Sequence, residues 1–251
     1  MTEIARAAAA GPLLALSDVD TYYGDSHILH GVSLTVQPGE IVALLGRNGV
    51  GKTTTIQTIL GLPPPQRGDI RFRGEVISGR PTYEIAQQGI GWVPQGHRIF
   101  PTLSTDENLQ LAAAKARLGR WTLDDTYELF PRLQSRRDAR GDTLSGGEQQ
   151  MLAIARALVQ NPDLLLMDEP SEGLSPRLVE EVGEIVQRLH EQGVAILLVE
   201  QNLNFALRIA QRLLIMNKGS ILFSGKPKEI AGDDQLCRQY LGVGIGAIPS
   251  H

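Results

Sequence analysis

A glycine-rich run from Gly46 to Thr53, with the sequence GRNGVGKT, has the spacing of a phosphate-binding loop. Its glycines let backbone N–H groups curl around phosphate oxygens, while Lys52 supplies a positive charge and Thr53 offers a hydroxyl to Mg²⁺. A chance glycine-rich turn is the alternative, but such a turn has no need of the apolar strand and the helix that flank this run. The residues predicted to contact phosphates are Gly46, Arg47, Asn48, Gly49, Val50, Gly51, Lys52, Thr53 and Thr54.

Two adjacent carboxylates follow a short apolar run, Leu164 to Met167. A buried strand here would deliver Asp168 at its C-terminal end, where ligands bind in open α/β sheets. We therefore expect Asp168 to hold a magnesium ion together with Thr53. Glu169 is placed to polarise a water that attacks a γ-phosphate in line. The alternative is that Glu169 only solvates the end of the strand.

A second anion site is indicated by the LSGGEQ run that begins at Leu144. Ser145 and Glu148 form a capping box, so a helix begins there, and its N–H groups beside Gly146 and Gly147 can bind an anion without a lysine. An ordinary capped helix would explain the serine and the glutamate but would leave the glycine pair unused. The economical explanation is that another subunit completes each half-site, so that two nucleotides lie between two subunits.

Strands and helices must position these motifs. Short β-like runs occupy the first part of the chain, and a mixed sheet is their simplest account; they are Leu14 to Val19, Ile28 to Val36, Ile41 to Leu45 and Asp69 to Phe72. The run Lys52 to Leu60 predicts a helix. Between Ser104 and Val159 the pattern becomes helical, which predicts a helical subdomain at about residues 100–160; its first helix has Ser104 and Glu107 as a capping box and Leu109, Leu111 and Ala112 on one face.

Apolar runs return later in the chain, at Leu164 to Met167 and Ala195 to Val199, and each is preceded by a helical pattern. This alternation is typical of a parallel sheet covered on both faces. Two more strands are expected at Leu213 to Met216 and Ser220 to Phe223, followed by a short helix near Gln235 to Tyr240. The predicted fold is α/β, with a mixed, mainly parallel sheet core, an antiparallel β subdomain and an α-helical subdomain.

The composition limits the functions available to the chain. It has 251 residues, 42% of them hydrophobic, and a net charge of -4, so there is no overall basic field and no nucleic acid is expected as a partner. No run is long enough to span a bilayer. The single cysteine, Cys237, has no internal disulfide partner. Residues 1–12 are expected to be a flexible tail instead of a signal peptide, 13–245 a single domain and 246–251 a second tail.

With these motifs in this order, the chain resembles the nucleotide-binding subunit of an ABC transporter from Leu13 to about Gly242. The resemblance implies a P-loop ATPase that uses ATP and Mg²⁺ and pairs with a second ABC ATPase subunit as a homodimer or a heterodimer. It also implies transmembrane permease subunits, an indirect link to a substrate-binding protein, and a peripheral location on the cytoplasmic face of the inner membrane.

Further residues receive roles from the resemblance. Tyr23 matches the aromatic residue that stacks on adenine, although the neighbouring Tyr22 leaves a plain strand residue as an alternative. Gln95 resembles the glutamine that touches the metal and relays to the membrane domain. Phe100 and Glu107 lie in the stretch that faces the permease in the family.

Two positions depart from the family pattern: Ser175 stands where an aspartate is usual, and Gln201 where a switch histidine is usual. A glutamine can donate a hydrogen bond to the γ-phosphate but cannot take up a proton near neutral pH. Gln201 is therefore expected to sense or position, which leaves Glu169 as the candidate base.

These departures make the chain similar to the second ATPase of importers for branched-chain amino acids and urea. Tyr240 to Gly242 favours the amino-acid branch, whereas Tyr22 to Leu29, Arg47 to Val50 and Val93 to Gly96 resemble the urea branch. We favour amino acids.

Two other classes of protein fit less well. ABC ATPases of DNA repair need a long coiled coil between the two motifs, and only about ninety residues separate them here, while those of the ribosome carry two ATPase halves in one chain. A P-loop kinase has no use for LSGGEQ.

The basic run Arg132, Arg136, Arg137 and Arg140 is interpreted as a solvated helical face and not a binding patch. Trp92 and Trp121 are expected to pack, and the histidines lack metal-ligand spacing.

Overall fold

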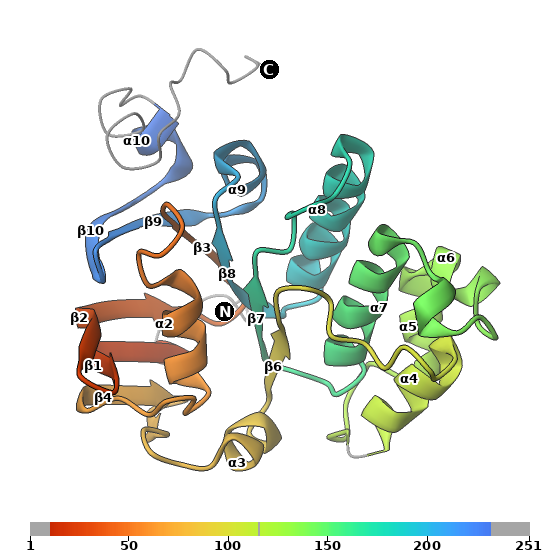
Figure 1. The fold of residues 1–251 in the computed structure, drawn as a ribbon, viewed down its shortest axis with the longest axis horizontal. Coiled ribbons are helices and arrows are strands. Elements are labelled where there is room, and N and C mark those ends of the chain that lie inside the picture. The colour runs from red at the N-terminus through yellow and green to blue at the C-terminus, as the bar shows by residue number, and fades with distance from the viewer. Residues whose placement is uncertain (1–10, 115, 232–251) are drawn as a thin grey trace, which may run out of the picture.

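The structure, a computed structural model, describes residues 11–114 and 116–231. Cys237, the Tyr240 to Gly242 run, the helix expected near Gln235 to Tyr240 and the tail 246–251 lie outside the described residues, as does most of the tail 1–12. Within the described part, two β-sheets and a group of helices lie side by side (Figure 1).

The first sheet is antiparallel and contains most of the strands predicted near the N-terminus. Its order is β2-β1-β4-β5, with β1 at Leu14–Tyr23, β2 at Ser26–Val36, β4 at Arg67–Phe72 and β5 at Glu75–Val76. The strand Ile41–Leu45 does not join it. The expectation of one mixed sheet over this segment is therefore wrong, because that uniformly apolar run needs burial on both faces and an antiparallel sheet with one solvated face does not supply it.

The second sheet is mixed and forms the centre of the molecule. Its order is β10-β9-β3-β8-β7-β6, and all neighbours are parallel except the edge pair β10 and β9. The strands are β3 (Ile41–Leu45), β6 (Ile90–Val93), β7 (Leu164–Asp168), β8 (Ala195–Glu200), β9 (Arg212–Asn217) and β10 (Ser220–Gly225). Every residue of β3, β7 and β8 is buried, as expected for strands covered on both faces.

The helices divide between the two faces of this sheet. They are α2 (Lys52–Ile59), α3 (Thr82–Gln87), α4 (Thr105–Ala113), α5 (Leu123–Leu129), α6 (Pro131–Ser135), α7 (Gly146–Leu158), α8 (Pro176–Glu191), α9 (Leu203–Ile209) and α10 (Pro227–Ala231). Val42 and Leu44 of β3 join the apolar cluster that contains Ile56 of α2 and the antiparallel sheet. Ala43 and Leu45 point the other way, into the cluster built by α7, α8 and α9.

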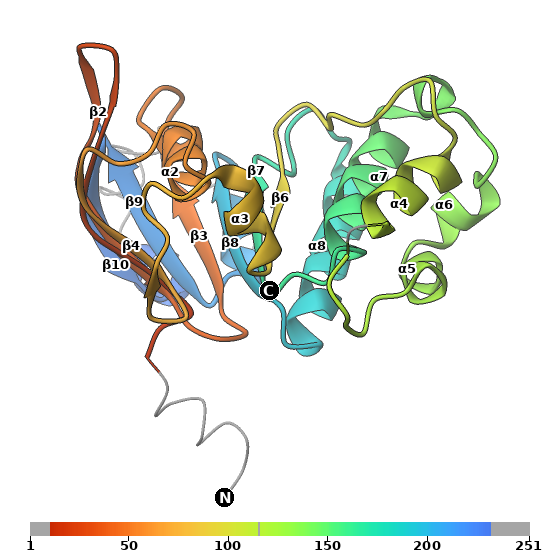
Figure 2. The ribbon, with the colours of Figure 1, turned by 90° about the horizontal axis from the view of Figure 1, so that it is seen from below.

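Helices α4 to α7 form the predicted helical subdomain, which lies on the far side of β7 from α2 in both ribbon views (Figures 1 and 2). Both predicted capping boxes are present, Ser104 with Glu107 and Ser145 with Glu148. On the predicted apolar face of α4, Leu109 is buried as expected, but Leu111 is 52% exposed, because the other residues that α4 buries are Thr105 and Asn108. Trp92 and Trp121 pack against the two apolar clusters, as predicted.

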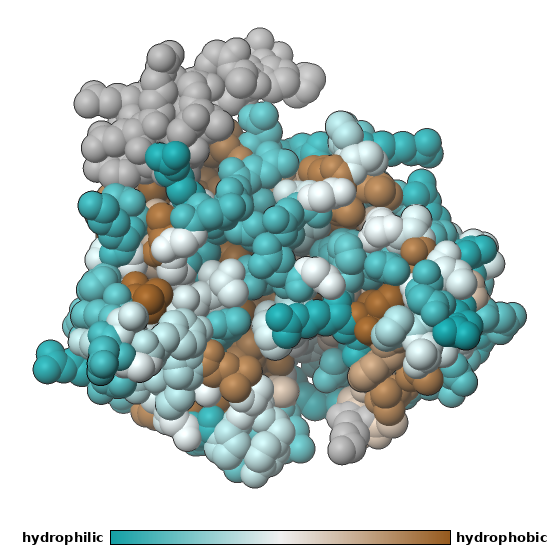
Figure 3. Space-filling view, in the orientation of Figure 1, coloured by the Kyte–Doolittle hydropathy of each residue, from teal (hydrophilic) through white to brown (hydrophobic). Residues whose placement is uncertain are grey.

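The surface agrees with the interpretation of the arginine run as a solvated face. Each arginine of the run forms an ion pair with an acidic side chain; the pairs are Arg132 with Glu181, Arg136 with Glu148, Arg137 with Asp106 and Arg140 with Asp142. The face in Figure 3 is mostly hydrophilic, with hydrophobic residues in separate groups. Among the helices that the structure describes, none has the length and apolar character needed to cross a membrane.

Candidate functional site

The predicted site residues gather where the parallel strands end. Gly46 follows β3, Gln95 comes two residues after β6, Asp168 ends β7, and Gln201 follows β8. In the register of the sheet, Leu45 lies opposite Glu200, and Asp168 lies opposite Val199. Parallel pairing therefore brings four separate segments to one edge, which is where open α/β sheets bind ligands.

The phosphate loop leads into α2 in the way its sequence predicts. Gly51 is the N-cap of α2 with φ 112°, in the region that favours glycine. No described side chain caps this helix and its first turn has no acidic residue, so its N-terminal N–H groups can bind an anion. Lys52 is 3% exposed, and its Nζ donates to the carbonyl oxygens of Gly46 at 2.9 Å and Arg47 at 3.2 Å.

Glu169 is held by two other predicted residues. Its Oε1 pairs with Lys52 Nζ at 3.1 Å, and its Oε2 accepts a hydrogen bond from Gln201 Nε2 at 3.0 Å. Glu169 is 8% exposed and has φ 48°, a left-handed conformation that is unfavourable for a residue with a side chain. A residue that merely solvated the end of a strand would not need this buried and strained placement.

Thr53 and Asp168 meet beside this carboxylate. Thr53 Oγ1 donates to Asp168 Oδ1 at 3.0 Å, and Asp168 is 2% exposed. Burial raises the pKa of Asp168, and the hydrogen bond from Thr53 only partly offsets that effect. A hydroxyl and a carboxylate oxygen at the edge of a phosphate loop are donors that suit Mg²⁺, so the residues fit this ion.

Gln95 is not brought to the Thr53 and Asp168 pair by the contacts of the described residues. Its Nε2 donates instead to Glu172 Oε2 at 2.6 Å, in the loop after β7. This contact holds Gln95 beside the segment that follows Glu169. Its expected part in metal binding stays a prediction.

The two neighbouring tyrosines have different surroundings. The ring of Tyr22 stacks on His27, with centroids 4.1 Å apart and planes 7° from parallel. Tyr23 is 44% exposed, and its hydroxyl donates to Gln57 Oε1 of α2 at 2.5 Å. Of the two, Tyr23 therefore has the more accessible ring.

The two glycines of the LSGGEQ run have different surroundings. A Cβ on Gly147 would lie 2.5 Å from Leu178 Cδ1, so a larger residue here must shift the side chain of Leu178 on α8. A Cβ on Gly146 would have no atom of the described residues within 4 Å, so their packing gives no reason for this glycine. Ser145 N donates to Glu148 Oε2 at 2.8 Å; burial alone would raise the pKa of Glu148, but the hydrogen bonds from Ser145 lower it.

The two predicted anion sites lie on opposite faces of the central sheet. Helix α2 packs with Val42 and Leu44, whereas α7 packs in the cluster that contains Ala43 and Leu45. Figures 1 and 2 show the two helices on either side of β7. The two motifs of one chain therefore do not form one closed nucleotide site.

Sequence reasoning missed Glu200, which ends β8 and is 2% exposed. Its carboxylate accepts hydrogen bonds from the backbone N–H groups of Ser171, Gln201 and Asn202. Burial raises the pKa of Glu200, and these hydrogen bonds oppose that shift. The sequence did contain a signal for this residue: a charged side chain ends the otherwise apolar strand β8, at the edge of the sheet where ligands are expected to bind.

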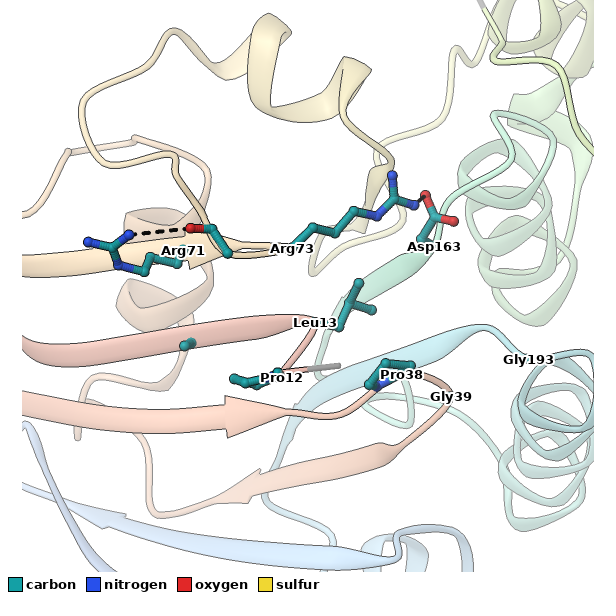
Figure 4. A pocket seen from close by; sticks show the side chains of 11 residues that line it. Pro12, Leu13, Pro38, Gly39, Arg71, Arg73, Asp163 and Gly193 are labelled. Atoms are coloured by element: carbon teal, nitrogen blue, oxygen red, sulfur yellow. Dashed lines mark hydrogen bonds and ion pairs between the residues drawn. The ribbon is translucent and has the colours of Figure 1, made fainter. Parts of the chain in front are cut away.

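A cavity of about 550 Å³ lies at the opposite edge of the sheet (Figure 4). Pro38, Asp163 and Gly193 line it, and each precedes one of the parallel strands. Arg73 and Asp163 form an ion pair at its side. None of the predicted site residues lines this cavity.

Comparisons with known proteins find relatives over most of the length of the chain. A family model described as ABC transporter matches residues 29–172. The high-affinity branched-chain amino acid transport ATP-binding protein BraG of Pseudomonas aeruginosa is 42% identical over 232 residues, which cover 92% of this chain and 100% of that protein. The lipopolysaccharide export system ATP-binding protein LptB of Haemophilus influenzae is 37% identical over 236 residues, covering 92% and 97%.

The fold also matches a solved dimer. That structure is a post-hydrolysis state of an ATP-binding cassette bound to ADP and Pi, with 25% identity and a TM-score of 0.75, and the match covers 85% of this chain and 98% of that one.

Proposed function

The chain belongs to the ABC transporter family, and from this premise we propose that it is the ATP-hydrolysing subunit of an importer for branched-chain amino acids. An ATPase subunit of a transporter is the function common to these relatives. The finer assignment rests on one observation, the 42% identity along the whole length of BraG. The match to LptB at 37% supports the second candidate, a lipopolysaccharide exporter, and an importer of urea or short amides is the third.

The cargo is tested with the permease subunits that co-purify with the chain. Reconstituted into vesicles with a substrate-binding protein, the complex is expected to hydrolyse ATP faster with leucine, isoleucine or valine than with urea. Stimulation by urea alone would instead assign the chain to an importer of urea or short amides. Stimulation by lipopolysaccharide without any binding protein would assign it to a lipopolysaccharide exporter. The same preparation would show one or two kinds of ATPase subunit, which distinguishes a homodimer from a heterodimer.

We propose that each phosphate loop binds ATP and that the LSGGEQ helix of a second ABC subunit completes the binding site of that nucleotide. Two observations support this: α2 and α7 lie on opposite faces of one sheet, and a related cassette forms a dimer with ADP and Pi. Such a pair would act as a peripheral assembly on the cytoplasmic face of the inner membrane. In each subunit, residues 13–245 would form a single ATPase domain.

In this mechanism the N-terminus of α2 and Lys52 attract the phosphates. Thr53 and Asp168 would hold Mg²⁺, whose charge would neutralise phosphate oxygens when it is bound. Glu169 takes the proton from the attacking water as general base. Gln201 keeps that carboxylate in place through the hydrogen bond at 3.0 Å and does not exchange protons itself.

Replacing Glu169 by Gln tests the assignment of the base. Turnover is expected to be abolished, while ATP still drives two subunits together, because the amide keeps the size of the side chain but cannot accept the proton. Glu180→Gln, at an exposed position of α8, is the matched control and keeps normal turnover. Hydrolysis retained in the Glu169→Gln protein would remove Glu169 from this role.

A further inference from the structure

Glu200 is a buried carboxylate whose oxygens point to two different loops. Its Oε1 accepts a hydrogen bond from the backbone N–H of Ser171 at 2.9 Å. Its Oε2 accepts from the backbone N–H groups of Gln201 at 3.0 Å and Asn202 at 3.1 Å. A charge this deeply buried, with 2% exposure, is costly unless hydrogen bonds satisfy it, and here backbone N–H groups do so.

The two loops both lead to Glu169. Ser171 lies two residues after Glu169 on the loop that follows β7, and Gln201 follows β8 and donates its side-chain N–H to Glu169. The contacts therefore form a closed ring: Glu169 is linked through the chain to Ser171, Ser171 bonds to Glu200, Glu200 bonds to the backbone of Gln201, and the side chain of Gln201 returns to Glu169. The ion pair with Lys52 and the hydrogen bond from the backbone N–H of Glu169 to the Val199 carbonyl also hold Glu169, whereas Glu200 links the loop after β7 to the loop after β8.

We propose that Glu200 is a positioning residue, which sets the loop that bears Glu169 and the loop that bears Gln201 relative to each other. It does not contact the reacting atoms. The inference rests on the proposed role of Glu169 as base, since it explains how that carboxylate keeps its strained, left-handed conformation with φ 48°. Asn202, whose side chain caps α9, extends the same support to the next helix.

A carboxylate suits this position better than an amide of equal size. Glutamine has one acceptor oxygen, and its NH₂ group would face an N–H donor on one of the two loops. Glu200→Gln therefore keeps the volume but releases either the Ser171 side or the Gln201 side. A catalytic group displaced by a small distance loses much of its rate, so we expect kcat to fall about ten- to a hundredfold.

The test is steady-state ATP hydrolysis by the assembled transporter. In Glu200→Gln the KM for ATP is expected to stay within about twofold, because the phosphate loop is untouched, while kcat falls. Glu40→Gln is the matched control: Glu40 is a partly buried carboxylate bonded to Arg212 and to the backbone N–H of Gln37, at the start of β3 and away from the site. That control should lower the melting temperature and leave kcat unchanged.

A double variant separates positioning from general damage. If Glu200 acts by orienting Gln201 and Glu169, the loss of kcat caused by Glu200→Gln should be smaller in a Gln201→Ala background. The product of the fold-losses in the two single variants should then exceed the fold-loss in the double variant. If Glu200→Gln does not fold, Glu200→Asp is measured instead, since its shorter side chain keeps both oxygens but cannot reach both loops; it too should lower kcat at unchanged KM.

An unchanged kcat, a loss confined to stability as in the Glu40 control, or independent multiplication of the two losses would each overturn the proposal. Glu169→Gln, assayed alongside, keeps the two hypotheses apart. Retained hydrolysis in that variant defeats the role of Glu169 as base. Abolished hydrolysis there, together with normal kcat in Glu200→Gln, defeats the positioning role alone.

Discussion

Gly146 offers a direct test of the split nucleotide site, because the two glycines of the LSGGEQ run, Gly146 and Gly147, differ in what surrounds them. A Cβ on Gly146 would meet no atom of the described residues within 4 Å, whereas a Cβ on Gly147 would lie 2.5 Å and 2.7 Å from the two methyl groups of Leu178. Gly146 is also the first residue of α7, where an alanine adopts the backbone without strain. Within the part of the chain that the structure describes, packing therefore gives no need for glycine at this position.

The two alanine substitutions should affect stability differently. Gly146→Ala removes the entropy that glycine loses on folding and should raise the free energy of unfolding by about 0.5–1 kcal/mol, or the melting temperature by roughly 1–4 °C. Gly147→Ala gains the same propensity but must also shift the partly exposed side chain of Leu178, so its gain in stability should be smaller.

Hydrolysis should respond differently. In the proposed dimer a methyl group on Gly146 stands where phosphate of the partner's nucleotide approaches the N-terminus of α7, and a lost hydrogen bond to a charged group costs about 1.5–3 kcal/mol, which is roughly a ten- to hundredfold lower rate. ATP binding by the isolated monomer should be unchanged. Thermal unfolding, nucleotide binding by the monomer and hydrolysis by the assembled transporter measure the three quantities. A stable Gly146→Ala protein that hydrolyses ATP at the normal rate would refute the reasoning, since no ligand would then approach this helix.

Three further predictions concern the helical subdomain. Ser145→Ala should cost about 1 kcal/mol of stability through the lost cap and should impair hydrolysis without weakening ATP binding by the monomer; weaker monomer binding would contradict the split site. Burial alone would raise the pKa of Asp106, but hydrogen bonds from an arginine and a tyrosine lower it, so the stability this carboxylate gives is present above pH 3.8 and is lost as pH falls through the folded value. Asp106→Asn should therefore destabilise the protein to urea at pH 7 and progressively less below pH 3.8. Asp138→Asn, at an exposed position, is the control and should leave the stability unchanged in both pH ranges. Leu152→Ala, in the core of α7, should cost about 2–5 kcal/mol in urea unfolding, against less than about 0.5 kcal/mol for Leu111→Ala at its exposed site.

The motifs and the strands that carry them were predictable because their signals are local. A glycine loop needs a strand before it and a helix after it, and β3 and α2 supply both at the expected residues. Continuous apolar runs identified the strands β7 and β8 since a strand covered on both faces has no polar side. Capping boxes located the starts of α4 and α7 because two side chains at a fixed spacing satisfy the helix terminus themselves.

Features that depend on contacts between distant segments were not predictable in the same way. Leu111 looked like part of an apolar face, but the neighbours of α4 bury Asn108, whose side chain bonds to three backbone carbonyls of the preceding loop. The contact between Gln95 and Glu172 joins residues 77 positions apart. Which strands share a sheet is equally non-local, so the separation of β3 from its sequence neighbours became visible only in the fold.

Gln201 and Glu200 together explain how a chain without the usual histidine can still hold its candidate base. A glutamine side chain carries no charge and cannot restrain a carboxylate by ion pairing, so its own position must be fixed by other groups. Glu200, the preceding residue, supplies that restraint by accepting a hydrogen bond from the backbone N–H of Gln201. Its other oxygen accepts the backbone N–H of Ser171, in the loop after the neighbouring strand β7. A buried carboxylate satisfied by backbone donors is rigid, because releasing any one of them would leave a costly unpaired charge. The neutral residue at the switch position and the buried acid beside it are thus best understood as one unit, and substitutions at either are expected to depend on the other.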